Sequence, residues 1–403
     1  MQAVIIAAGE SSRFWPLNQG HKSQFYLLGK PLLYWTLKGI YENDIKDVVI
    51  VCNPNSSIPS MLEKEKDFNM SIAYVIQEKP LGTGNALWQA REFIKESFFV
   101  VWPNKVSAGV LVAKMKATQK EQKAEVVLVG AKTSVPWNYG IARLDGERVI
   151  EIVENPEPGA EPSKVKVIGS YFFQPDFFSY YEKLSKHHEA DFIDAINLYL
   201  KDKKASLVEH QEDVPALKYP WELFGILDIL LHLRGGKQII APSATIGEGT
   251  VIKGPVYIGD NCEIGPYNVL RGPLDLERGV QTRAFCEIKR SIVQEGTHFH
   301  SGYVGDSIIG RDCRFGAGFV AANRRLDRGM INAVVKEKKV DTGLTALGAI
   351  IGNEAQLGIH SGTMPGVFIG SQCVIGPSSM VAENVQDNTV LYTKFDQVIK
   401  KRN

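Results

Sequence analysis

The feature that most constrains the fold is a six-residue period that begins near residue 240. Aliphatic residues recur at sixth positions in three runs, which start at Ile240, Ile309 and Ile351. Glycine often follows the aliphatic residue, as it does after Ile246 and Ile258. A period of six fits neither the 3.6-residue repeat of a helix nor the alternation of a hairpin. It predicts a triangular β-solenoid, in which each side of a coil is one short strand and one tight corner.

Four of the five cysteines share one place in this repeat, four residues after a step. They are Cys262, Cys286, Cys313 and Cys373. We expect that place to point inward near a corner, where a small side chain packs. The chain contains no CxxC pair, so the cysteines are interpreted as reduced packing residues. This favours a cytoplasmic protein and argues against a disulfide framework or a zinc site.

Residues 1–235 follow a different pattern, in which short β-rich runs alternate with helical stretches. The expected strands are 3–7, 48–52, 73–77, 98–102 and 126–129, and the expected helices include 85–94, 110–120 and 220–234. This alternation predicts an α/β domain with a mostly parallel sheet. We therefore expect two domains, residues 1–235 and 236–395. A loop at 322–349 interrupts the solenoid and projects from it.

Charge and hydropathy exclude several classes of protein. The chain has 46 basic and 45 acidic residues, so it has no chain-wide basic surface for nucleic acid. No apolar run reaches the roughly 18 residues that a membrane span needs. The N-terminus passes directly into an apolar run and a glycine, so no signal peptide is expected.

A loop of small residues follows the first expected strand and reads AAGESSRFWPL at residues 7–17. In open α/β sheets, ligands bind beyond the carboxyl ends of the strands. Backbone N–H groups of such a loop can approach a phosphate, and Arg13 and Lys22 would add cations. The alternative is an ordinary strand-to-helix turn with solvated basic residues.

With Lys22, this loop resembles the signature of sugar-phosphate nucleotidylyltransferases. The resemblance extends to QEKPLGTGNA at 77–86, to YGI at 139–141 with VENP at 153–156, and to YPWE at 219–222. It implies a Rossmann-like α/β nucleotidyltransferase domain. There a sugar-1-phosphate would attack a nucleoside triphosphate, UTP or dTTP, and release pyrophosphate.

The resemblance also implies roles for individual residues. Arg13 and Lys22 would be catalytic, Arg13 on the β- and γ-phosphates and Lys22 on the reacting phosphates. The nucleotide would be bound by Ala8, Gly9 and Gln77, and the sugar by Gly82, Thr83, Gly140 and Glu154.

One segment departs from that family's pattern. After the strand at 98–102 the family usually has a Gly-Asp pair whose carboxylate holds Mg²⁺, but this chain reads WPNKV at 102–106. Asn104 or Lys105 therefore stands where a carboxylate is expected, and a protonated lysine cannot ligate magnesium. The second carboxylate would be Glu222. Asn155 likewise stands where a lysine is usual. The metal ligands stay unknown at this point.

A second motif lies in the repeat half and reads HFHSGYVGDSIIG at 298–310. With FGAG at 315–318, AN at 322–323 and LGAIIG at 347–352, it resembles the acetyltransferase domain of bifunctional N-acetylglucosamine-1-phosphate uridylyltransferases. The resemblance implies a left-handed parallel β-helix, acetyl-CoA as co-substrate, His300 as general base and Asn323 as a sugar contact. A surface histidine at a corner is the alternative for His300. His298 is expected to be a bystander, and His360 to lie near the acyl-donor groove.

One further departure lies near the second motif, where LTA at 344–346 replaces an expected basic pair. The motifs predict a cytoplasmic transferase of nucleotide-sugar biosynthesis that assembles as a homotrimer. It would be both a sugar-1-phosphate nucleotidylyltransferase and an amino-sugar-phosphate N-acetyltransferase. Two alternatives stay open. One is an acetyltransferase with a degenerate first domain, and the other is a non-catalytic regulatory subunit. The sequence names neither the sugar nor the base.

Overall fold

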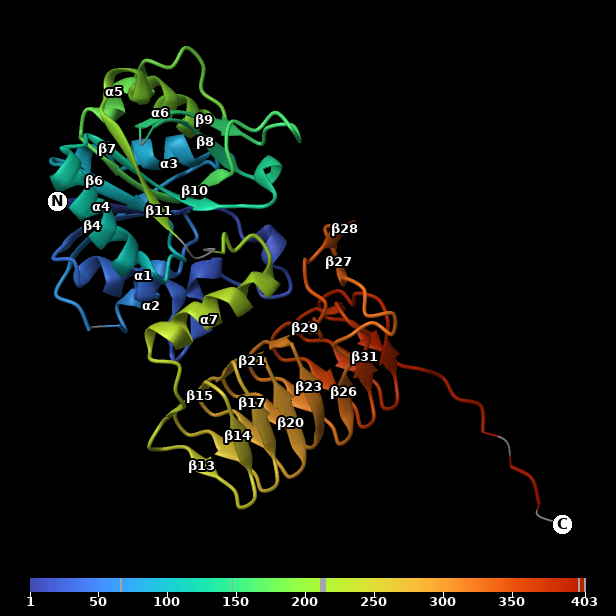
Figure 1. Cartoon of the computed structure of the whole chain (residues 1–403). Helices are drawn as coiled ribbons and strands as arrows, with labels where there is room; N and C mark the ends of the chain where they lie inside the picture. Colours follow the sequence, from blue (N-terminus) through green and yellow to red (C-terminus); the bar gives the residue numbers. More distant parts are fainter. Residues whose placement is uncertain (66, 147, 211–214, 398, 402–403) are drawn as a thin grey trace. The chain divides into compact units, whose positions relative to one another are not determined.

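The computed structural model describes residues 1–401 apart from positions 66, 147, 211–214 and 398, and it contains two compact units (Figure 1). The α/β unit comprises Met1–Ser11, Gly20–Phe25 and Lys30–Ala216, and the solenoid unit comprises Ser12–Gln19, Tyr26–Gly29 and Leu217–Asn403. Two short N-terminal segments thus belong to the unit that is otherwise C-terminal. The domain boundary expected at residue 235 stays a proposal.

A nine-stranded sheet forms the α/β unit. Its strands, in order across the sheet, are β5 (Ser71–Ile76), β4 (Asp47–Cys52), β1 (Gln2–Ala7), β6 (Phe98–Val101), β10 (Val165–Phe173), β7 (Val126–Lys132), β11 (Ala205–His210), β9 (Arg148–Glu154) and β8 (Gly140–Asp145). The first four are parallel, whereas β10 is antiparallel to both β6 and β7, and β9 is antiparallel to β8. The sheet is therefore mixed. Seven of its nine strands nevertheless run in one direction, against β9 and β10, so the expectation of a mostly parallel sheet is confirmed. Strands β8 to β11 were not among the predicted strands.

Helices cover both faces of this sheet and enclose two apolar cores. They are α1 (Leu32–Tyr41), α2 (Ile58–Leu62), α3 (Thr83–Gln89), α4 (Ala108–Gln122), α5 (Phe177–Glu182) and α6 (Asp191–Asp202). One core joins Leu37 of α1 to Leu111 of α4, and the other joins Ala86 of α3 to Phe192 of α6. The helix expected at 85–94 ends earlier, at Gln89. Within the described residues, no helix combines the length and apolarity needed to cross a membrane.

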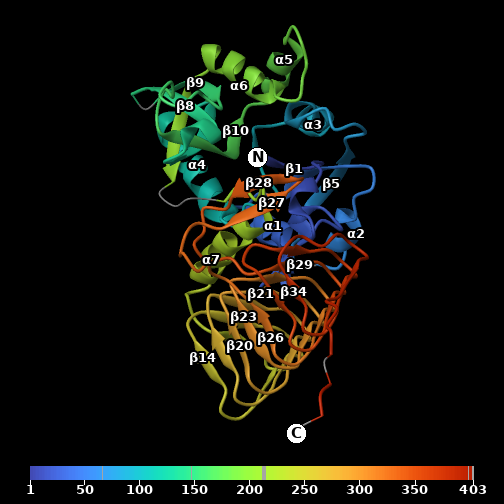
Figure 2. The same ribbon diagram turned by 90° about the vertical axis from the view of Figure 1, so that its right-hand side faces the viewer.

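Stacked parallel strands in three sheets form the solenoid (Figures 1 and 2). The first solenoid sheet contains β12 (Ile239–Ile240), β15 (Val256–Ile258), β18 (Leu274–Leu276), β21 (Ile292–Val293), β24 (Ile308–Ile309), β29 (Ile350–Ile351) and β32 (Phe368–Ile369). The second contains β13 (Thr245–Ile246), β16 (Glu263–Ile264), β19 (Gln281–Thr282), β22 (His298–Phe299), β25 (Arg314–Phe315), β30 (Gln356–Leu357), β33 (Val374–Ile375) and β35 (Val390–Leu391). The third contains β14 (Val251–Lys253), β17 (Val269–Arg271), β20 (Cys286–Lys289), β23 (Gly302–Gly305), β26 (Phe319–Ala321), β31 (Gly362–Thr363) and β34 (Met380–Val381). The fold class predicted from the sequence is confirmed.

Strand pairing explains the six-residue period and the place where it breaks. Ile240 pairs with Ile258 of the next coil, eighteen residues on, so three six-residue sides complete one coil. Leu276 pairs with Val293, and Val293 with Ile309, which are seventeen and sixteen residues apart. The run of sixth positions therefore loses its register where these two shorter coils begin.

The steps of the repeat fill the solenoid interior, as predicted. Every step from Ile258 to Ile288 is at most 3% exposed, and so are Cys262, Cys286, Cys313 and Cys373, which confirms their packing role. Ile240 and Ile246 are the exceptions, at 37% and 38% exposed. They lie in the first coil, which has a neighbouring coil on one side only.

One helical segment precedes the coils, and one long loop interrupts them. A 3-10 turn, Pro220–Glu222, and helix α7 (Leu223–Leu233) precede them. The segment 322–349 interrupts them and contains an antiparallel hairpin, β27 (Asn332–Val335) with β28 (Lys338–Asp341), that stands apart from the coils in Figure 1. The expected loop is therefore partly a hairpin. The C-terminal end of this segment is held by two backbone hydrogen bonds. The N–H of Leu347 donates to the carbonyl of Asn323, and the N–H of Gly348 donates to the carbonyl of Asp306.

Two candidate active sites

A cavity of about 480 Å³ lies beyond the carboxyl ends of β1, β5 and β6 in the α/β unit. Six of the predicted site residues line it: Ala8, Gly9, Lys22, Gln77, Gly82 and Thr83. They converge because neighbouring parallel strands end at the same edge of the sheet. Ala8 and Gly9 follow β1, and Gln77 follows β5. This is the edge at which open α/β sheets bind ligands.

The turn between β5 and α3 forms one wall of the cavity. Gly82 has a φ of +93°, and a side chain there would overlap the backbone of Glu189, so only glycine fits. Gln77, at 5% exposure, donates from Nε2 to the carbonyl of Gly82 and to Oδ1 of Asn85, both at 3.0 Å. These bonds fix the turn that carries Thr83.

His21 and Lys22 lie on a short 3-10 turn in another part of the lining. Nδ1 of His21 is 2.7 Å from the hydroxyl of Ser23. Burial, with a smaller contribution from Lys22, lowers the pKa of His21 to about 3. The imidazole is therefore neutral near pH 7. Among the described lining residues Lys22 is then the one cation, and its backbone N–H is held by the hydroxyl of Ser11 at 2.9 Å.

Asn104, one of the two residues expected at the position of the family's carboxylate, lines the cavity. Its side chain is 2% exposed, and neither Oδ1 nor Nδ2 has a hydrogen-bond partner among the residues that the structure describes. Lys105 is equally buried but does not line the cavity. A buried amide without partners costs about 1–3 kcal/mol unless a ligand satisfies it. The structure therefore directs attention to Asn104 rather than Lys105.

The donors in the described part of the chain do not fit a protein-held magnesium ion. No group of three or more His, Cys, Asp or Glu side chains is arranged to hold a metal there. Glu222 lies in the solenoid unit, where its carboxylate accepts the backbone N–H groups of Lys218 and Tyr219 and so caps its own turn. The amide of Asn104 carries no negative charge to balance a divalent cation.

Three predicted site residues are not in the cavity lining. Gly140 begins β8 and Glu154 ends β9, where they are cross-strand partners, and a side chain at Gly140 would overlap the Glu154 carboxylate. Arg13 lies on the 3-10 turn Ser12–Phe14, which belongs to the solenoid unit, and its side chain is exposed.

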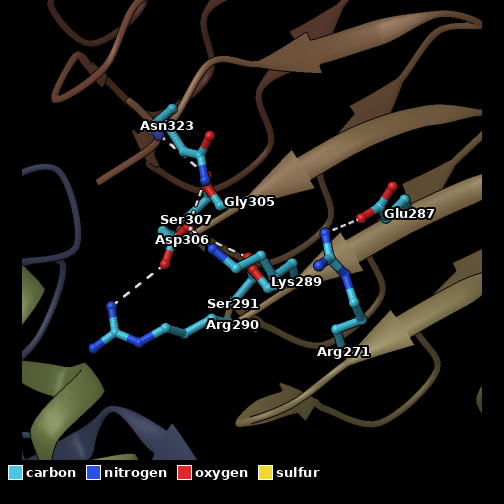
Figure 3. Close-up of polar contacts among 10 residues, drawn as sticks. Arg271, Glu287, Lys289, Arg290, Ser291, Gly305, Asp306, Ser307 and Asn323 are labelled. Carbon is cyan, nitrogen blue, oxygen red and sulfur yellow. Dashed lines mark hydrogen bonds and ion pairs between the residues drawn. The ribbon is translucent and has the colours of Figure 1, made fainter. Parts of the chain in front are cut away.

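A polar cluster at the edge of the third solenoid sheet forms the second candidate site (Figure 3). Asp306 is 1% exposed, and its Oδ2 accepts from Nζ of Lys289 at 2.8 Å and from Nδ2 of Asn323 at 2.5 Å. The guanidinium of Arg290 lies 3.4 Å from Oδ1. Two cations and an amide thus balance one buried carboxylate. This contact fixes the direction of the Asn323 side chain, which the sequence motif had singled out.

Arg271 and Lys289 extend the cluster and were not found from the sequence. They are register partners on β17 and β20, so two cations lie on adjacent strands. Glu287 forms an ion pair with Arg271, but Nε of Arg271 is buried with no hydrogen-bond partner among the described residues (Figure 3). Each of the two cations is thus paired with a carboxylate, Arg271 with Glu287 and Lys289 with Asp306. The separation of eighteen residues between Arg271 and Lys289, which is the length of one coil, is the sequence signal that could have predicted that they lie on adjacent strands.

Two polar groups converge beside this cluster. A side chain at Gly305 would overlap both the hydroxyl of Tyr303 and the amide of Asn323. Burial raises the pKa of Tyr303, so its hydroxyl stays protonated and able to donate. Glycine at this position leaves both groups accessible to a hydroxylated ligand.

His300 lies at the corner between the second and third solenoid sheets. It follows β22 directly, its side chain is exposed, and its backbone N–H donates to the carbonyl of Phe315 at 3.0 Å. His360 lies at the same corner beyond one intervening coil, with its ring over Gly318. His298 is half-buried, and burial together with Arg314 lowers its pKa.

Comparisons with known proteins cover both halves of the chain. Residues 2–225 match the nucleotidyl transferase family, and residues 239–272 match the bacterial transferase hexapeptide repeat. A bifunctional sugar-1-phosphate nucleotidylyltransferase/acetyltransferase of Sulfurisphaera tokodaii is 33% identical over 96% of this chain and 98% of its own. The bifunctional protein GlmU of Methanococcus maripaludis is 31% identical over the whole of both chains. An apo UDP-glucose pyrophosphorylase structure, 18% identical, shares the fold over 58% of this chain and 99% of its own, with a TM-score of 0.50.

Proposed function

Because the chain belongs to the nucleotidyl transferase family and is similar to bifunctional members of it along almost its whole length, we propose that it is a two-site transferase of nucleotide-sugar biosynthesis. The cavity in the α/β unit would transfer a nucleotide, and the solenoid would transfer an acetyl group. The observation that carries the first half is the convergence of six motif residues on one cavity at the carboxyl edge of the sheet.

In the first reaction an oxygen of the sugar-1-phosphate attacks the α-phosphorus of UTP or dTTP. The bond from that phosphorus to the bridging oxygen breaks, and pyrophosphate leaves. Such a transfer depends on positioning and charge neutralisation rather than on a nucleophilic side chain. Lys22 would neutralise the reacting phosphates, Arg13 the departing ones, and the turn at Gly82 would hold the sugar. Gln77 would read the base through Oε1, since its Nε2 is bonded within the turn.

Magnesium enters this proposal only as the counter-ion of the triphosphate. No step is assigned to a protein-held ion, because the donor set around Asn104 does not fit one.

In the second reaction the amine of an amino-sugar phosphate attacks the thioester carbonyl of acetyl-CoA. The new C–N bond forms, the C–S bond breaks, and the amine proton passes to His300. The cations Arg271 and Lys289 would bind the sugar phosphate, and Asn323 and Tyr303 would hold its hydroxyl groups. The side chain of His300 is exposed and therefore accessible to a bound substrate.

Exposed apolar side chains support a homotrimer. They follow the third solenoid sheet and its corners, each at least 44% exposed: Tyr267, Phe285, Val320, Met364 and Met380. The rings of Tyr267 and Phe285 are stacked, with centroids 5.7 Å apart. Aligned apolar groups of this kind mark protein interfaces. The free, buried thiols of the five cysteines support a reducing compartment, so we assign the enzyme to the cytoplasm.

One assay set tests this function. Pyrophosphate release is measured for a panel of sugar-1-phosphates with UTP and dTTP, and free thiol release for amino-sugar phosphates with acetyl-CoA. We expect turnover in both assays from the same preparation. Absence of both activities across the panel would contradict the proposal and leave the non-catalytic subunit.

One observation favours a second candidate, an acetyltransferase with a degenerate nucleotidyltransferase domain. It is the replacement of the metal carboxylate by Asn104, whose amide has no partner among the described residues. Thiol release without pyrophosphate release would establish this alternative.

A further inference from the structure

The three sheets of the solenoid differ in what lies on their outer faces. Outward residues of the first sheet are 0% exposed from the third strand onward: Asp275, Ile292, Ile308, Ile350 and Phe368. Their strand neighbours, such as Ile309 and Ile369, point into the solenoid core. Ile239 and Tyr257 on the first two strands are half-buried. On the second sheet the corresponding residues Glu263, Arg314 and Gln356 are exposed. One apolar face of the solenoid is therefore covered by other parts of the chain, and we call it the covered face.

The segment Ser12–Gln19 covers the C-terminal end of this face. The ring of Trp15 lies against Phe368, with centroids 6.0 Å apart, and Nε1 of Trp15 donates to Oδ2 of Asp387 at 3.1 Å. Nε2 of Gln19 donates to the hydroxyl of Ser371 at 2.6 Å, and Oε1 of Gln19 accepts from Asn353. An apolar ring and three hydrogen bonds thus hold one segment to three different coils.

The segment Tyr26–Gly29 covers the middle of the face. The backbone N–H of Gly29 donates to Glu277 at 3.0 Å, and that of Leu28 to Asp275 at 3.4 Å. Gln294 donates to the carbonyl of Tyr26 at 3.0 Å. The acceptors are 0% and 3% exposed, and burial raises the pKa of both, that of Glu277 to about 7. Burying two carboxyl groups costs free energy unless they are hydrogen-bonded. Here both accept backbone N–H groups of the segment Tyr26–Gly29 and so hold it against the solenoid.

These two held segments bracket the cationic residues of the nucleotidyl transfer signature. Arg13 lies within the first, two residues before Trp15, and Lys22 lies between the first and the second. We propose that the covered face of the solenoid fixes residues 12–29 in their nucleotide-binding conformation. Phe368, Asp387 and Glu277 are thus positioning residues for Arg13 and Lys22. The functional half of this inference rests on the proposed nucleotidyl transfer, whereas the anchoring itself does not.

The test uses Phe368→Ala in the full-length protein, with Phe395→Ala as the control on an exposed ring of the same unit. Amide hydrogen exchange of residues 12–19 reports the anchoring, and the Kd for Mg·UTP and Mg·dTTP reports the function. We expect exchange to accelerate and the better-binding nucleotide to bind about tenfold more weakly, because a displaced cation loses its aligned contacts. Acetyl transfer should keep its wild-type rate, and Phe368→Trp should restore nucleotide binding.

Each outcome decides one part of the inference. Unchanged exchange in Phe368→Ala would overturn the anchoring. Faster exchange with an unchanged Kd would overturn the positioning role. If Phe368→Ala does not fold, the polar double variant Gln19→Ala/Asp387→Ala takes its place, since both side chains are exposed. A wild-type chain that binds neither nucleotide would contradict the proposed function instead, and the exchange data would still decide the anchoring.

Discussion

The cavity of the α/β unit and the polar cluster of the solenoid are both expected to receive a sugar phosphate, yet they are charged in different ways. Among its described lining residues, the cavity contains one cation, Lys22, two carboxylates, Glu10 and Glu189, a neutral His21 and the unpartnered amide of Asn104. The solenoid cluster gathers Arg271, Lys289 and Arg290 around buried or paired carboxylates. The first site therefore depends on charge that the substrate brings with it, whereas the second is balanced before the substrate arrives.

The largest expected effect concerns His300 in the solenoid. His300→Ala should slow acetyl transfer by about 10²–10⁴, the range typical of a lost general base. Pyrophosphate release should keep its rate, because the other reaction uses no residue of this corner. His298→Ala is the matched control. A normal rate of thiol release from correctly assembled His300→Ala would shift the base to another residue, with His360 as the first to examine.

Lys289 tests whether the solenoid cluster binds the phosphate. Lys289→Ala should raise KM for the amino-sugar phosphate roughly ten- to hundredfold, the ~1.5–3 kcal/mol of a hydrogen bond to a charged group. The kcat should change less, since Lys289 does not touch the reacting amine. Lys253→Ala, on the same sheet and exposed, is the control. An unaltered KM would mean that the cluster serves only the fold.

Asn104 tests whether the cavity lacks a carboxylate that binds magnesium. Asn104→Asp restores a carboxylate and should increase the magnesium activation of nucleotidyl transfer by about tenfold, since a bound metal typically supplies several kcal/mol of charge stabilisation. Lys105→Ala should leave the magnesium response unchanged, because Lys105 is outside the lining. Strong magnesium activation of the wild type that Asn104→Asp does not alter would mean that the metal ligands lie elsewhere.

The smallest expected effect is on stability against pH, where the two regions should respond in opposite directions. The pKa of Glu277, raised to about 7, means that the folded solenoid binds more protons than the unfolded chain between about 4.5 and 7. Its stability should fall as the pH rises through that window. The pKa of His21, lowered to about 3, means that the unfolded chain binds more protons between about 3 and 6.5. The stability of the α/β unit should therefore rise with pH there.

Thermal unfolding between pH 4.5 and 7 measures both trends. In Glu277→Gln the pH dependence of the solenoid transition should weaken, with the remainder due to Asp275, while the transition of the α/β unit should keep its own. Parallel pH profiles for the two transitions would contradict the assignment of these shifts.

The sequence predicted those parts of the molecule that local patterns determine. The six-residue step predicted the solenoid and the burial of Cys262 and Cys373, and strand-end motifs predicted which loops meet at the cavity. The two strands that run against the others, β9 and β10, were not predicted as strands. Predicting that Arg271 and Lys289 are neighbours requires the length of the coil between them, which the strand pairing shows.

Two other features depend on tertiary packing alone. Asn104 lines the cavity whereas Lys105, equally buried, does not, and the sequence could not distinguish these two adjacent residues. The inclusion of Ser12–Gln19 in the solenoid unit arises from contacts with residues more than 330 positions away, which no local pattern encodes.

The most direct test of the account is a crossed assay of two variants, Lys22→Ala and His300→Ala, each measured for pyrophosphate release and for thiol release. The two reactions are assigned to separate sites in one chain. Lys22→Ala should therefore lose at least about a hundredfold of nucleotidyl transfer and keep acetyl transfer, and His300→Ala should show the reverse. If either variant lost both activities while remaining folded and assembled, the assignment of two independent sites would be contradicted.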